Sequence, residues 1–336
     1  MISEFRSMSR YRGDAIPAGI CAVLLFITSA ESGAQVPNVS GRHRVEVAST
    51  IDESPQPSYL ILPPGYDPDG PEIPVVVSLH TWSFDVEQRN ETLEEAVAKR
   101  GWIYLFPDFR GSNDKVEACG SDVAKQDVID ALDWVLEHFP VDRNRVYLTG
   151  VSGGGFMTLA MVASYPDRWT AASAWVPLSD LRAWYDFHAE DPYGEMTRHC
   201  FGGDPAKDPS VVAEMERRSP LHQLGRAKDV ALDISAGRFD GHLGAPIPVW
   251  HTLAAFNVIA EAVGAPQITA QEIAELSRHD PRLNHPLESD LVEDPTFGRQ
   301  IFLRRRAGRS RVTIFDGAHE GLPDAAIAWF GAHPRR

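Results

Sequence analysis

Short apolar runs alternate with longer stretches in which apolar residues recur every three or four positions. Several short runs are continuously apolar, which is typical of strands buried on both faces of a parallel sheet. The longer stretches have the period of amphipathic helices. The predicted strands are Arg44–Ala48, Ser58–Leu62, Pro74–Leu79, Trp102–Phe106, Arg145–Thr149, Ala171–Val176, Val230–Ser235 and Arg311–Phe315. The predicted helices are Glu91–Arg100, Asp122–His138, Gly155–Tyr165, Val249–Val263 and Asp324–Ala332.

This alternation predicts an α/β fold, with a mostly parallel eight-stranded sheet and helices on both faces. Only the short segment Asp52–Pro57 separates the first two strands, so they are expected to form an antiparallel edge. Two long stretches rich in polar residues, glycine and proline break the alternation, at about 184–224 and 264–308. Insertions of this length in α/β enzymes usually lie over the carboxyl ends of the strands, so we expect both over the active-site face.

A serine surrounded by glycines lies where a predicted strand meets a predicted helix. The segment Gly150–Gly154 reads GVSGG, with VYLT before it and an apolar helical stretch after it. This context fits the G-x-S-x-G nucleophile elbow, in which small neighbours allow a strained, exposed serine. The alternative is an ordinary glycine-rich turn. We predict that Ser152 is a catalytic nucleophile.

A serine nucleophile needs a base, and in this fold the chain order is serine, acid, histidine. His319 follows the last predicted strand in the segment DGAHEG and is the predicted base. Asp240 follows the preceding strand and is predicted to accept the Nδ1–H of His319. Three other carboxylates are alternatives for the acid: Asp229, Asp233 and Asp316.

The oxyanion formed by attack on a carbonyl needs two N–H donors. Gly153, directly after the nucleophile, is predicted to supply one. Trp82, in the loop after the third strand, is predicted to supply the other, with Thr81 as the alternative. The Trp82 ring would either line the acyl pocket or pack in the core. His80 and Thr81 are predicted to contact substrate. Trp184 and Tyr185, in the first insertion, are predicted either to contact substrate or to anchor their loop.

The N-terminal segment has the pattern of a signal peptide. Three arginines precede an apolar stretch, Ala18–Ala30, and small residues follow it. We therefore expect residues 1–34 to be removed, leaving one hydrolase domain, 35–336, that is secreted or periplasmic. The alternative is a buried N-terminal helix. Cys119 and Cys200 would remain in an oxidising compartment, so a disulfide is expected between them, with two buried thiols as the alternative.

Charge and residue spacing also limit the partners. The net charge of −15 argues against nucleic acids and anionic membranes as partners. The apolar stretch is too short for a stable membrane anchor. The two cysteines lie 81 positions apart without a nearby histidine pattern, so no metal or other cofactor is expected. The oligomeric state is left open.

From about residue 63 to residue 329, the chain resembles the α/β-hydrolase superfamily, and within it the catalytic domains of prolyl-oligopeptidase-like serine hydrolases. The segment PDFRGS at Pro107–Ser112 resembles the family segment after the fourth strand. The segment VDRNRV at Val141–Val146 resembles the approach to the nucleophile strand. The spacing Gly237-x-x-Asp240-x-x-Leu243 also matches the family. The resemblance implies a Ser-Asp-His mechanism and independently supports Asp240 as the acid.

Two departures from this family shape the functional prediction. Too few residues precede the hydrolase core for the family's β-propeller, and the loop HTW at 80–82 replaces the usual tyrosine or Gly-Gly pair. We therefore predict a secreted serine esterase that cleaves small or polymer-linked carboxylic esters. The alternative is a peptidase or aminopeptidase, with Glu190, Asp191 and Glu195 binding an amine. A non-catalytic binding module is a third reading, against which the complete triad argues.

Overall fold

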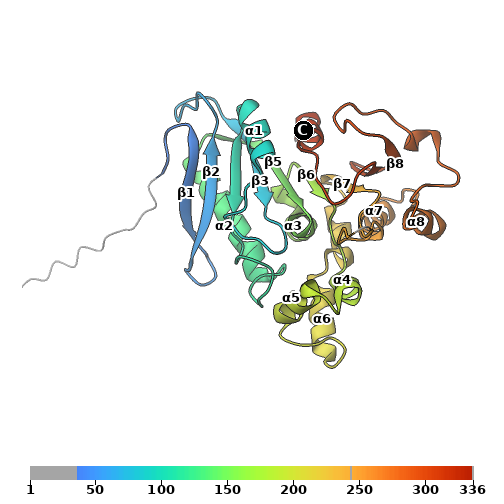
Figure 1. Cartoon of the computed structure of the whole chain (residues 1–336). Helices are drawn as coiled ribbons and strands as arrows, with labels where there is room; N and C mark the ends of the chain where they lie inside the picture. Colours follow the sequence, from blue (N-terminus) through green and yellow to red (C-terminus); the bar gives the residue numbers. More distant parts are fainter. Residues whose placement is uncertain (1–35, 243, 335–336) are drawn as a thin grey trace, which may run out of the picture. The chain divides into compact units, whose positions relative to one another are not determined.

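The computed structural model describes residues 36–242 and 244–334, so the predicted signal peptide lies outside the described residues. The strands are β1 (Gly41–Ala48), β2 (Pro55–Leu62), β3 (Ile73–Leu79), β4 (Ile103–Pro107), β5 (Val141–Val151), β6 (Ala171–Trp175), β7 (Ala231–Gly237), β8 (Ile301–Ala307) and β9 (Ser310–Phe315). They form one nine-stranded sheet in the order β1-β2-β4-β3-β5-β6-β7-β9-β8 (Figure 1).

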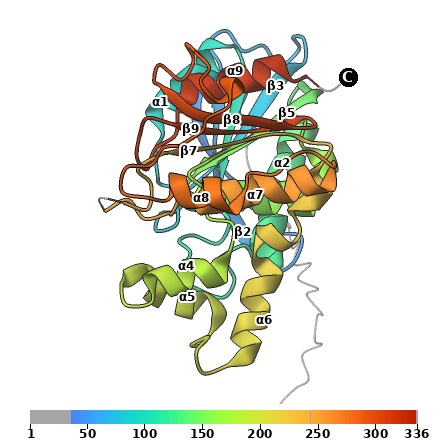
Figure 2. The same cartoon turned by 90° about the vertical axis from the view of Figure 1, so that its right-hand side faces the viewer.

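The α-helices are α1 (Glu91–Lys99), α2 (Asp122–His138), α3 (Gly153–Ser164), α4 (Leu181–His188), α5 (Pro192–Phe201), α6 (Pro209–Arg218), α7 (Trp250–Ala262), α8 (Ala270–Leu276) and α9 (Pro323–Ala332). Helices α1 and α9 pack together on one face of the sheet, while α2, α3 and α7 cover the other (Figure 1 and Figure 2). Both faces are therefore buried, which explains why β4, β6 and β7 consist entirely of buried residues.

The predicted fold class is confirmed. Strands β4, β3, β5, β6, β7 and β9 are parallel to their neighbours in the centre of the sheet, and β1 and β2 form the predicted antiparallel edge. Parallel strands place their carboxyl ends at one edge of the sheet, so the loops after β3, β5, β7 and β9 can meet there.

The sheet has one strand more than predicted. Strand β8 lies in the second insertion and pairs antiparallel with β9. Its three consecutive arginines hide the apolar alternation that marks a strand. The structure neutralises two of them: Arg304 contacts Asp294 at 2.7 Å and Arg305 contacts Asp290 at 2.5 Å. These ion pairs allow a charged sequence to pair at the edge of the sheet.

The first insertion contains three helices that lie together away from the sheet (α4, α5 and α6 in Figure 2). Each of three contacts joins it to a loop at the carboxyl edge. Met196 lies beside Ser83 after β3, Cys200 is bonded to Cys119 after β4, and His188 contacts Pro246 after β7. The insertion therefore packs on the loops that frame the carboxyl ends of the strands.

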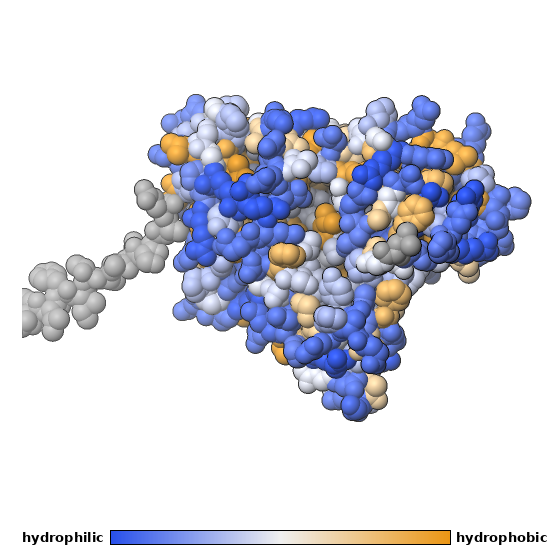
Figure 3. Space-filling model, viewed as in Figure 1, coloured by the Kyte–Doolittle hydropathy of each residue, from blue (hydrophilic) through white to orange (hydrophobic). Residues whose placement is uncertain are grey.

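The surface view in Figure 3 is dominated by hydrophilic side chains, with hydrophobic ones in small separate groups. Within residues 36–242 and 244–334, no helix is long and apolar enough to cross a membrane.

Candidate active site

Ser152 lies at the sharp turn between β5 and α3. Its backbone has φ 60° and ψ −120°, a conformation that residues with a side chain rarely adopt. Its N–H donates to the carbonyl of Trp175 at 2.9 Å, which fixes the turn against the neighbouring strand. The side chain is partly exposed. Backbone strain of this kind, at the carboxyl end of a strand, is characteristic of a functional position.

Close backbone contacts explain the glycines around this serine. A Cβ at Gly150 would lie 2.3 Å from the carbonyl oxygen of Gly154, and a Cβ at Gly154 would lie 2.2 Å from that of Leu79. Real Cβ atoms do not approach so closely, so the turn can close only with glycine at both positions. The elbow thus presents one hydroxyl on a rigid backbone, as the sequence pattern indicates.

His319 and Asp240 are brought together by the loops after β9 and β7. The Nδ1 of His319 lies 2.9 and 3.0 Å from the two carboxylate oxygens of Asp240. Asp240 is buried and also accepts the N–H groups of Gly241 and Ile247, each at 3.1 Å. Burial raises the pKa of Asp240, whereas the hydrogen bond from His319 opposes that rise. His319 itself is partly exposed, with 22% of its side chain accessible.

The other candidate acids have different partners. Asp233 is buried in β7 and forms an ion pair with Arg311 at 2.6 Å. Asp316 pairs with Arg238 at 2.8 Å, and Asp229 pairs with a surface lysine. Asp240 is therefore the carboxylate that the structure places on the histidine.

Two backbone N–H groups lie close together beside the serine. A Cβ built on Gly153 would lie 2.3 Å from the backbone nitrogen of Trp82, so these two residues are in direct contact. The N–H of Thr81 already donates to the Gln88 side chain at 2.8 Å. Among the described residues, the N–H groups of Trp82 and Gly153 have no acceptor. This arrangement favours Trp82 over Thr81 as an oxyanion donor.

Asn113 holds the Trp82 backbone in place through hydrogen bonds, a role that the sequence did not predict. Its backbone N–H and its side-chain amide donate to the Trp82 carbonyl at 2.8 and 3.3 Å. Its side-chain oxygen accepts the N–H of Cys119 at 2.7 Å, and the predicted Cys119–Cys200 disulfide is present. A single asparagine in a loop has no periodic pattern, so only the fold reveals its contacts.

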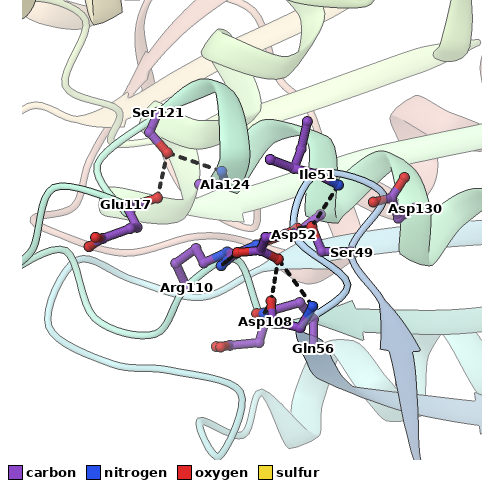
Figure 4. A network of polar contacts seen from close by, with 12 residues as sticks. Ser49, Ile51, Asp52, Gln56, Asp108, Arg110, Glu117, Ser121, Ala124 and Asp130 are labelled. Carbon is purple, nitrogen blue, oxygen red and sulfur yellow. Dashed lines mark hydrogen bonds and ion pairs between the residues drawn. The ribbon is translucent and has the colours of Figure 1, made fainter.

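Asp108 and Arg110, in the loop after β4, hold two neighbouring segments. Asp108 accepts the N–H groups of Val86 and Gly111 at 3.2 and 2.9 Å, which ties the loop after β3 to the loop after β4. Arg110 donates to Asp127 at 2.5 Å, which ties the same loop to α2. It also donates to Asp52 at 2.7 Å, which ties the loop to the edge hairpin (Figure 4). Both residues therefore connect the loop after β4 to neighbouring parts of the fold.

The predicted substrate contacts need correction. His80 is fully buried and stacked on Phe109 at 3.6 Å, and burial lowers its pKa to about 4. Trp184 is also buried, and its ring packs on the buried Trp82 ring at 5.8 Å. Tyr185 is 6% exposed. A substrate contact is therefore not supported for these side chains, which serve as loop anchors, whereas Thr81 is partly exposed.

Two cavities flank Val151, the residue before the serine. One, of about 190 Å³, is lined by the start of α9, including Gly321 and Leu322 just after His319. The other, of about 200 Å³, is lined by the loop after β3, including Thr81 and Gln88. Both also contact Thr149 and Asn90, and neither is lined by Ser152 or His319. Within residues 36–242 and 244–334, no cluster of histidine, cysteine and acidic side chains could hold a metal ion.

Comparison with models of protein families shows to which family this chain belongs. The model of the prolyl oligopeptidase family matches residues 88–268, more than half of the chain. The chain belongs to the prolyl oligopeptidase family. This match and the site together identify it as a serine hydrolase.

Individual relatives cover only parts of their own length. The human (Homo sapiens) acylamino-acid-releasing enzyme is 29% identical over 186 residues, 50% of this chain and 24% of that enzyme. Acetylxylan esterase A of Emericella nidulans is 27% identical over 88 residues, 26% of this chain and 28% of that protein. The chain thus spans about a quarter of the length of these relatives.

Solved structures share the fold. The uncomplexed acylaminoacyl peptidase of Pyrococcus horikoshii has a TM-score of 0.60 and 18% sequence identity. The match covers 88% of this chain and 42% of that one. At this identity the comparison establishes the α/β-hydrolase architecture of the described residues and no more.

Proposed function

We propose that this hydrolase is a serine peptidase that acts on short peptides with a blocked, acylated N-terminus. Ser152 is the nucleophile, His319 the general base and Asp240 the residue that orients His319. The N–H groups of Gly153 and Trp82 form the oxyanion hole. The hydrogen bond between His319 and the buried Asp240, at the same sheet edge as the strained Ser152, is the observation that carries this assignment.

The roles follow the proton. His319 takes the Ser152 proton through Nε2 as Oγ attacks the carbonyl carbon, and the two N–H groups stabilise the negative oxygen. The imidazolium then gives this proton to the departing amine, which leaves an acyl-enzyme. Water attacks the acyl-enzyme in the same way: His319 removes its proton and returns it to Ser152 as the acid leaves. Asp240 stabilises the imidazolium in both steps.

A peptide substrate is supported by the family match and by relatives named acylamino-acid-releasing enzymes. The blocked N-terminus has a second support in the first insertion. Among the carboxylates predicted to bind a free amine, Asp191 is committed to other contacts: it caps α5 and accepts a hydrogen bond from His188. Glu190 and Glu195 are exposed and lie in solvent. A neutral acylated terminus needs no such charged partner.

An ester substrate is the second candidate, favoured by the match to acetylxylan esterase A. The same triad and oxyanion hole cleave esters, whose alcohol leaves more readily than an amine. Hydrolysis of an activated ester would therefore not distinguish the two functions. Hydrolysis of an amide would distinguish them.

The test compares three substrates on the purified protein: an N-acetylaminoacyl nitroanilide, the same compound with a free amine, and acetylated xylan. We expect the acetylated nitroanilide to have the highest kcat/KM, and Ser152→Ala to reduce its turnover by about 10⁴-fold or more. Thr158→Ala, a change at a buried hydroxyl further along α3, is the matched control. Turnover of xylan acetate without nitroanilide hydrolysis would establish the esterase instead.

We also propose export, as the sequence predicts. A disulfide between Cys119 and Cys200 is compatible with an oxidising compartment. N-terminal sequencing of the protein expressed with its leader, after cell fractionation, tests this proposal. A protein that starts at residue 35 outside the cytoplasm is expected, and an uncleaved cytoplasmic protein would contradict it.

A further inference from the structure

A buried histidine of the first insertion lies behind the catalytic acid. His188, the last residue of α4, is 5% exposed and has a partner on each ring nitrogen. Its Nδ1 lies 2.6 Å from the carboxylate of Asp191, and its Nε2 lies 2.8 Å from the carbonyl oxygen of Pro246. A carbonyl can only accept, so Nε2 must carry a proton.

The second partner is an acceptor as well. Burial raises the pKa of Asp191, but hydrogen bonds from His188 and from the N–H groups of Tyr193 and Gly194 outweigh it, and the pKa is lowered. A carboxyl group with a lowered pKa is ionised at neutral pH, so Asp191 accepts from Nδ1. The imidazolium is the only form of the ring that donates to both partners at once.

One peptide group connects this histidine to the candidate triad. The Pro246–Ile247 peptide accepts from His188 through its C=O and donates to Asp240 through its N–H, at 3.1 Å. A peptide group is planar and rigid, so its two ends turn together. Asp240 in turn holds His319. A continuous series of hydrogen bonds thus runs from Asp191 to the catalytic base.

We infer that protonated His188 is a positioning residue, which sets the orientation of Asp240 through the Pro246–Ile247 peptide and makes activity depend on the His188 proton. This inference rests on the triad proposed above. When His188 loses one proton, the remaining one stays on Nδ1, because a carboxylate is the stronger acceptor. Nε2 then turns a lone pair toward the Pro246 carbonyl, and the peptide is released.

Other ionisable groups near His188 would not make activity depend on pH in this way. His251, on α7, is fully buried, and burial followed by the charge of His188 lowers its pKa to about 3, so it is neutral throughout. Tyr193, on α5, has its ring 5.1 Å from that of His188. It is retained in every variant below, so its contribution is constant.

Two replacements of His188 separate the donors. Glutamine can place an N–H near the position of Nε2 and keep the bond to Pro246, whereas asparagine reaches only the position of Nδ1. We expect His188→Asn to slow the reaction by about 10- to 100-fold, since a small misplacement of a catalytic group has effects of this size. His188→Gln should stay close to wild type and be insensitive to alkaline pH.

Asp191→Asn gives an independent test. Its side-chain oxygen can still cap α5, where Asp191 accepts the Tyr193 N–H. Its amide would donate to Nδ1, so a neutral His188 would keep its proton on Nε2 and hold Pro246. We therefore expect Asp191→Asn to abolish the alkaline decline of the wild type.

The experiment measures the rate of labelling by a fluorophosphonate from about pH 5.5 to about pH 10, a range that spans histidine titration. This readout needs no knowledge of the substrate, so a wrong peptide proposal would not affect it. Unlabelled wild type would reject the proposed nucleophile. Labelled wild type without an alkaline decline, an equal rate for His188→Asn, or an unchanged decline in Asp191→Asn would each overturn the inference. If His188→Asn does not fold by circular dichroism, Asp191→Asn decides.

Discussion

The Cα of Gly153 packs directly against the backbone nitrogen of Trp82, so that even a methyl group on Gly153 would lie 2.3 Å from that nitrogen. Two segments 71 positions apart in the sequence thus meet at one point, with both N–H groups free to bind an oxyanion. The contact is between backbones, so no side-chain adjustment can relieve a larger residue there.

Gly153→Ala should therefore push Trp82 away from the oxyanion. We expect kcat to fall by about 10²- to 10³-fold, the usual effect of losing one oxyanion donor, with a smaller change in KM. Steady-state kinetics on the best substrate measure both. Gly225→Ala is the matched control, because its Cβ would meet Ala262 at an ordinary 3.6 Å. Equal kcat values for the two variants would show that Trp82 does not form the hole.

Asp240→Asn should separate stability from activity. Burial raises the pKa of Asp240, so the native state binds its proton more tightly than the unfolded chain does. Stability therefore falls as the pH rises through the folded pKa, and above that pKa the buried charge destabilises the fold. Asparagine carries no charge and can still accept the N–H groups of Gly241 and Ile247 through Oδ1.

We expect Asp240→Asn to melt at a higher temperature than the wild type at about pH 7, and the difference to shrink near pH 4, where the unfolded carboxyl titrates. Its kcat should fall by about 10⁴-fold, because the amide cannot hold His319 in the required tautomer. Calorimetry at the two pH values and one kinetic measurement test both statements. A lower melting temperature at neutral pH would show that the His319 contact outweighs the burial of the charge.

The disulfide should support catalysis as well as stability. It closes a separation of 81 positions, which corresponds to about 4 kcal/mol in the chain-entropy model, although measured values are often smaller. The backbone N–H of Cys119 also donates to Asn113, which holds the Trp82 carbonyl, so the disulfide fixes the segment that carries this donor. Replacing both cysteines by alanine should therefore lower the unfolding free energy, measured with urea, and also lower kcat.

Asn113→Ala separates the two effects, since it keeps the disulfide but removes the side-chain contacts to Trp82 and Cys119. We expect its kcat to fall while non-reducing mass analysis still shows no free thiols. A variant with unchanged kcat would restrict the disulfide to a structural role.

Elements with a strong apolar period were predictable from sequence. Helix α2 has the predicted bounds, since its apolar positions recur without interruption and Ser121 caps it. Strand β8 was missed because two of its three arginines are neutralised by acids 10 to 15 positions away in the chain. Such partners are visible only once the chain is folded.

The candidate site shows the same division. Ser152, Asp240 and His319 lie at strand ends in a fixed chain order, so topology alone suggests them. His80 and Trp184 lie on loops that follow strands of the sheet, which made them candidates for substrate contacts. In the structure both side chains are buried in the core. Sequence position gives the loop on which a side chain lies, but packing gives its direction.

Helix α5 is linked to both halves of the site. Asp191, which caps its N-terminus, reaches the acid loop through His188. Cys200, in its last turn, is bonded to Cys119 after β4, and the Cys119 N–H donates to Asn113, which donates to the Trp82 carbonyl in the oxyanion loop. Its ten residues span only about 15 Å. A chimera that exchanges the first insertion with that of a relative must therefore carry over the loops after β4 and β7 as well. The unit to transfer is helix α5 together with the loops after β4 and β7. A design that transfers the helix alone would misplace Asp240, which orients His319, and would also loosen the oxyanion hole.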